Sequence, residues 1–69
     1  MVFEVVNRSN LTILKVTNFA DMLTVSDIHF LDTQGYKFRL NGQPVSAENA
    51  YTDAVTAYVR EIKANVDGR

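Results

Sequence analysis

The segment from Ser46 to Asn65 constrains the fold most, because it is the only long stretch of this chain with helical periodicity. At about 100° per residue, its larger apolar side chains gather on one broad face and its polar side chains fall opposite. Ser46 is placed to cap the first turn, Glu48 lies at the positive end of the helix dipole, and Asp67-Gly68 supplies a stop. The sequence therefore predicts a C-terminal helix with one face to bury. That face consists of Ala47, Tyr51, Ala54, Val55, Tyr58, Val59, Ile62 and Val66.

Three alanines, Ala50, Ala57 and Ala64, recur every seven residues along the flank of this predicted face. Small side chains allow another backbone to come close, either the chain's own sheet or the same helix of a second copy. Alanine is also simply a good helix former, and this plainer interpretation is favoured. The three alanines are the candidate contact of a homodimer.

Two short segments rich in β-branched residues lie near the start of the chain, well before the predicted helix. Met1–Val6 and Leu11–Thr17 flank the polar turn formers of residues 7–10, which predicts a hairpin. The second segment carries apolar residues on both faces, which indicates a bulge or a central position in the sheet.

The middle of the chain predicts a second hairpin. Asn18 can cap one helical turn anchored by Phe19, although an irregular segment is an alternative. From Leu23 the pattern is strand-like, with a change of phase across Ser26-Asp27, and residues 28–31 are expected to pair with 36–40 across the turn of residues 32–35.

The turn dipeptide Asn41-Gly42 is followed too soon by Pro44 for a long returning strand. Residues 43–45 are therefore an edge extension or a link into the helix. Together the elements predict one α+β domain over residues 1–69, a β-β-β-β-α chain in which an antiparallel sheet of about four strands packs on one C-terminal helix. A small curled β-barrel capped by the helix is the alternative fold.

Composition excludes several functions. A chain of 69 residues buries only about 60% of its unfolded surface, and it has no cysteine for a disulfide or a thiolate metal site. The net charge of −1 gives no overall attraction to nucleic acid. No apolar stretch approaches membrane-spanning length, so we expect a cytoplasmic protein that does not bind membranes.

The sequence lacks the usual signatures of catalysis. His29 is the only histidine, no acidic residues have metal-ligand spacing, and each glycine stands alone. We therefore expect no metal, no cofactor, no small-molecule substrate and no enzymatic activity.

One predicted surface could carry a function. If the second hairpin forms, His29, Leu31, Lys37 and Arg39 share its outward face, where cations surround an apolar residue. An ordinary solvated sheet face has the same composition. The sequence thus favours a protein-binding module, a regulator or inhibitor of a larger protein, with a homodimer as an option. Such a chain has the style of the small accessory proteins of phages and mobile elements. The alternatives are a nucleic-acid-binding regulator that uses Lys37 and Arg39, which the charge disfavours, and a small structural assembly subunit.

Overall fold

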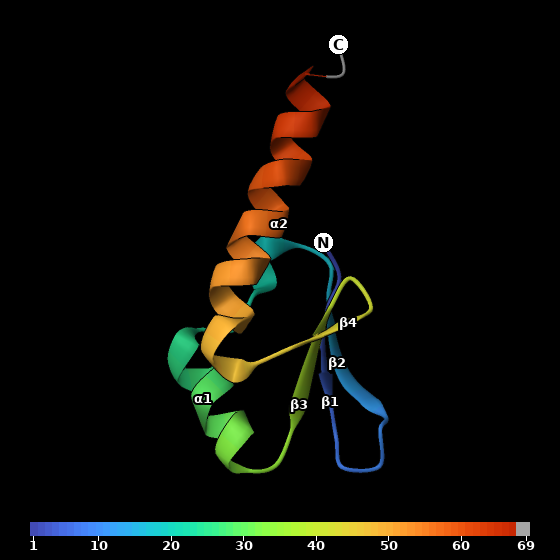
Figure 1. Cartoon of the computed structure of the whole chain (residues 1–69), viewed down its shortest axis with the longest axis vertical. Coiled ribbons are helices and arrows are strands. Elements are labelled where there is room, and N and C mark those ends of the chain that lie inside the picture. The colour runs from blue at the N-terminus through green and yellow to red at the C-terminus, as the bar shows by residue number, and fades with distance from the viewer. Residues whose placement is uncertain (68–69) are drawn as a thin grey trace.

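The computed structural model describes the backbone of residues 1–67 and the side chains of residues 1–64. Its strands form one open antiparallel sheet, and both α-helices lie on one side of that sheet (Figure 1). The predicted α+β fold with four strands and a C-terminal helix is confirmed, and the barrel alternative is wrong because the sheet does not close. The elements are, in order, β1 (Phe3–Val6), β2 (Thr12–Val16), the 3-10 turn η1 (Phe19–Asp21), α1 (Val25–Thr33), β3 (Lys37–Leu40), β4 (Gln43–Val45) and α2 (Ala47–Asp67).

The sheet has the strand order β2-β1-β3-β4, so β1 and β3 are the inner strands and β2 and β4 are the edge strands. Phe3 lies opposite Val16 on one side and Leu40 on the other. The register with β2 shifts between Val5 and Val6, which leaves Ile13 as an extra residue. The bulge predicted for this strand is confirmed, whereas the central position is wrong.

The core lies between the sheet and the two helices. The rings of Phe3 and Phe38 stack across β1 and β3 with centroids 5.9 Å apart. Ile28 of α1 and Ala50 of α2 cover them from the helical side. The buried cluster consists of Phe3, Val5, Val16, Ile28, Phe38 and Ala50.

Residues 25–33 form helix α1, and the strand predicted from Leu23 is therefore wrong. The Thr24 hydroxyl accepts a hydrogen bond from the Asp27 amide at 3.1 Å, which caps the first turn. This Thr-x-x-Asp spacing marks a helix start, and the change of phase across residues 26–27 reflects the three-residue spacing of Ile28 and Leu31. The element order is consequently β-β-α-β-β-α, with β3 and β4 as the second hairpin.

The helical turn predicted after Asn18 is confirmed as η1. The Asn18 Oδ1 atom accepts from the Ala20 amide at 3.0 Å, and the ring of Phe19 contacts two tyrosines of α2. Phe19 lies 5.8 Å from Tyr51 and 5.0 Å from Tyr58 between ring centroids. The anchoring role expected of Phe19 follows from these contacts.

Helix α2 begins where the sequence predicts, with the Ser46 hydroxyl accepting from the Asn49 amide at 3.3 Å. Its buried face is centred on Ala50 and Ala54, which are fully buried, rather than on the larger apolar residues. Small side chains at the centre let the helix backbone approach the strands closely. The C-terminal half of α2 projects beyond the sheet (Figure 1).

The link between β3 and β4 is a two-residue hairpin. Asn41 and Gly42 both have positive φ, 51° and 81°, as a type I′ turn requires. Pro44 follows on the three-residue edge strand β4, a position where proline is tolerated. Of the two interpretations of residues 43–45, the edge extension is confirmed.

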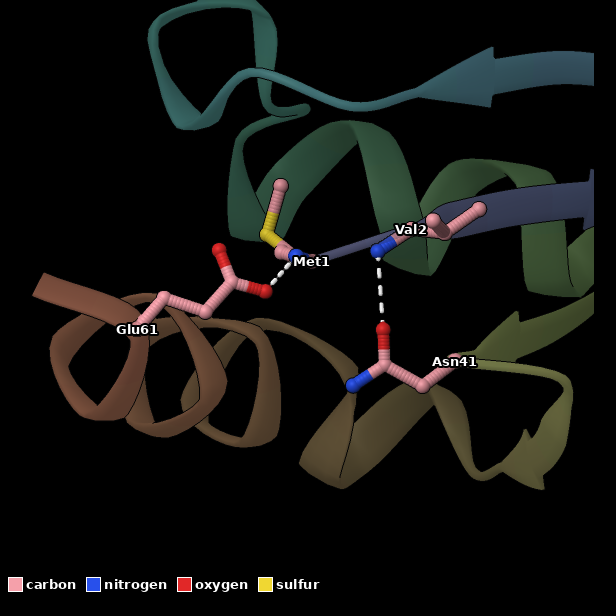
Figure 2. A network of polar contacts seen from close by, with 4 residues as sticks. All are labelled: Met1, Val2, Asn41 and Glu61. Atoms are coloured by element: carbon pink, nitrogen blue, oxygen red, sulfur yellow. Dashed lines mark hydrogen bonds and ion pairs between the residues drawn. The ribbon is translucent and has the colours of Figure 1, made fainter. Parts of the chain in front are cut away.

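Three polar contacts join the residues just before β1 to distant elements, and two of them are drawn in Figure 2. The ammonium group of Met1 forms an ion pair with Glu61 of α2. The Asn41 Oδ1 atom accepts from the Val2 amide at 2.9 Å, and the Asn41 amide donates to the Val2 carbonyl at 2.7 Å. Thus β1 is tied to α2 and to the β3–β4 turn.

Within residues 1–67, neither α-helix combines the length and the apolar character that crossing a membrane requires.

Candidate interaction surface

The structure separates the residues predicted to share a partner-binding face. His29 and Leu31 belong to α1, where His29 is exposed and Leu31 packs half-buried against the core. Lys37 and Arg39 alternate with the buried Phe38 along β3, so they lie on the face of the sheet away from the helices. The predicted shared face is wrong, because it required His29 and Leu31 to lie on a strand.

Lys37 and Arg39 do meet in an open groove of about 530 Å³. The groove lies where β4 ends and the chain passes into α2, and it extends from the outer face of the sheet to the helical layer. Pro44 borders it on the sheet side. Two of the four predicted residues therefore line one concave surface.

Arg39 is positioned by a hydrogen bond from its Nη2 atom to Oδ1 of Asn10, 3.1 Å long. Asn10 adopts a positive φ of 66° in the β1–β2 connection, a conformation that asparagine tolerates well. Val6, opposite Lys37 in the ladder, lines the groove between these groups and is only 1% exposed. The groove thus combines an apolar floor with an oriented guanidinium group.

The helical side of the groove carries the opposite charge. Asp32 in the last turn of α1 and Glu48 in the first turn of α2 line it there. A polyanion would be attracted by Lys37 and Arg39 but repelled by these carboxylates, whereas a protein segment that carries both signs of charge can match both sides. Side chains of both charges therefore line the two sides of one groove.

The three alanines predicted as a dimer contact do not form a common exposed flank. Ala50 is fully buried in the core of its own chain, Ala57 is half-buried, and Ala64 is exposed. The prediction that Ala50 contacts a second copy is wrong, because the sheet of its own chain already covers this side chain. The other interpretation of the small side chains, close approach of the chain's own sheet, is correct for Ala50.

Seven large apolar side chains are exposed among the described residues, and two of them, Val59 and Ile62, were predicted to lie on the buried face of the C-terminal helix. The seven fall on the edge strand β2 and the loop before it, on α1 and on the projecting part of α2. The residues are Leu11, Ile13, Leu14, Val25, Phe30, Val59 and Ile62. One signal of this exposure was present in the sequence, namely the apolar residues on both faces of β2. An edge strand with a bulge can leave one of its faces uncovered, so some of these residues are exposed.

The described residues contain no group of three or more His, Cys, Asp or Glu side chains placed to hold a metal ion. No side-chain hydrogen bond between described residues involves His29.

Comparisons with protein-family models, with curated proteins and with solved structures give no match. The fold itself defines a class, a two-layer α+β domain with a four-stranded antiparallel sheet in the order β2-β1-β3-β4.

Proposed function

We propose that this chain is a small non-enzymatic protein-binding module that regulates or inhibits a larger protein. The observation that carries the proposal is the groove with cations on its sheet side and carboxylates on its helical side, above the apolar floor of Val6. In this proposal the partner inserts a segment with both charges, whose acidic residue meets Lys37 and Arg39. The partner is a protein of the cytoplasm, as for the accessory proteins of phages and mobile elements that block host proteins.

The hydrogen bond to Asn10 supports this assignment, because a guanidinium group that is already oriented loses less side-chain entropy when it pairs with a carboxylate. Arg39 is also only half-exposed, so a charge pair formed there is screened less by solvent than one on an open surface.

The test is capture of partners from extracts of the cells that produce the protein, followed by quantitative mass spectrometry. Lys37→Glu combined with Arg39→Glu reverses the cationic side of the groove. Arg60→Glu combined with Lys63→Glu makes the same change of charge at exposed sites outside the groove. We expect one protein to be retained by the wild type and the control pair and to be reduced at least about tenfold by the groove pair.

Equal retention by both pairs, or no retained protein, would reject the groove as a protein-binding site. The same variants are tested with labelled DNA and RNA at low salt. A mobility shift that the groove pair abolishes would support the nucleic-acid alternative instead.

A further inference from the structure

The edge strand β2 is open along its outer side. It pairs only with β1, so the N–H and C=O groups of alternate residues point away from the sheet. None of the backbone hydrogen bonds between described residues outside the helices and sheet ladders involves residues 12–16. An edge of this kind is a template for another strand.

The side chains along β2 do little to discourage pairing. Natural edge strands are protected by charged residues, by proline or by bulges, and here the strand has one lysine, Lys15, and the bulge at Ile13. Leu11, Ile13 and Leu14, within one four-residue stretch, are exposed at 62%, 51% and 39%. Leu14 lies opposite the buried Val5, so it extends the core face of the sheet to the open edge.

We propose that β2 pairs antiparallel with β2 of a second copy, with Leu14 opposite Leu14 at the two-fold axis. Charge disfavours the neighbouring register centred on Lys15. Centring the pair on Lys15 would set two lysines against each other, whereas centring it on Leu14 sets each Lys15 opposite Ile13 of the other copy. In the resulting eight-stranded sheet the inner face continues across the interface, because Val5 and Leu14 of one copy are followed by Leu14 and Val5 of the other.

The opposite edge explains why the assembly closes as a dimer. Strand β4 has three residues, and Pro44 removes a backbone donor from its middle. A chain with one receptive edge forms an isologous pair, while two receptive edges would allow open-ended growth. The groove beside β4 remains free, so this inference is independent of the proposed function.

The test is sedimentation velocity across a concentration series, with far-UV circular dichroism to verify folding. We expect the wild type to show a reversible monomer–dimer equilibrium. Leu14→Glu and Leu14→Lys should each be monomeric, because each sets like charges at the two-fold axis, and their equimolar mixture should restore a dimer by pairing opposite charges.

The matched control is Ile62, which is 45% exposed on α2. Ile62→Lys should leave the equilibrium within about twofold of the wild type. A monomeric wild type at all concentrations, dissociation by Ile62→Lys, or a mixture of the Leu14 variants that stays monomeric would each overturn the proposal. None of these outcomes affects capture of a partner by the groove, so the two proposals fail separately.

Discussion

The ring of Phe19 stacks on that of Tyr58, with centroids 5.0 Å apart and planes inclined by 19°. Phe19 also meets Tyr51 edge-on, so one side chain of η1 contacts α2 at two positions seven residues apart. Since these positions are two turns apart on one face of the helix, this contact fixes the segment between β2 and α1 against α2.

Replacing Phe19 by alanine should remove this contact. We expect Phe19→Ala to lower the free energy of unfolding by about 2 kcal/mol, less than for a fully buried aromatic residue because Phe19 is only half-buried. Urea denaturation measures the change. Phe30→Ala, at a side chain that is 63% exposed, should change stability by less than about 0.5 kcal/mol, and equal losses would contradict the anchoring role.

The cap of α1 gives a direct test of helix against strand in this segment. Thr24→Ala removes the acceptor for the Asp27 amide and should cost about 1 kcal/mol, while Thr24→Ser keeps the hydroxyl and most of that stability. Both changes are followed by thermal or urea unfolding. If the two variants were equally stable, the cap would make no contribution.

The alanines of α2 should respond differently to an added side chain. Ala50→Leu overfills a site with no exposed surface and should destabilise the fold by about 2 kcal/mol or more. Ala64→Leu, at an exposed position, should be neutral within about 0.5 kcal/mol. If Ala64→Leu changed the sedimentation coefficient, that result would support the dimer contact that the sequence predicts for these alanines.

The ion pair between the Met1 ammonium group and Glu61 should be sensitive to salt. Glu61→Gln should cost no more than about 1 kcal/mol at low ionic strength, because half of the Glu61 side chain is exposed to solvent (48%). The difference from the wild type should shrink when salt is raised to about 1 M, where exposed charges are screened within a few ångströms. A loss that stays constant across salt concentrations would point to packing instead of charge.

Local signals explain which elements could be predicted. Ser46 capping α2, Asn18 before η1 and the Asn41-Gly42 turn each act through contacts within a few residues, so the sequence carried them. Thr24 was an equally local signal for α1, and the prediction missed it because the alternation of apolar residues from Leu23 also fits a strand. That error placed His29 and Leu31 on the same predicted face as Lys37 and Arg39, whereas the structure puts them on α1 and leaves Lys37 and Arg39 on β3.

The candidate site depended on contacts that no local pattern contains. Arg39 and Asn10 are 29 residues apart in sequence and meet only because β1 lies between β2 and β3. Asp32 and Glu48 join the same groove because α1 ends and α2 begins beside the short strand β4.

By itself, the sequence determined the helix from residue 47, the first hairpin, the turn at Asn41-Gly42 and the need to bury one apolar face in so short a chain. Only the tertiary structure decided that Ala50 rather than a larger residue faces the sheet, that β2 is an open edge, and that side chains of both charges line one groove. The physical reason is the distance along the chain over which the interactions act. Caps and turns are set by neighbouring residues, whereas strand order and helix rotation minimise the exposed apolar surface of the whole chain.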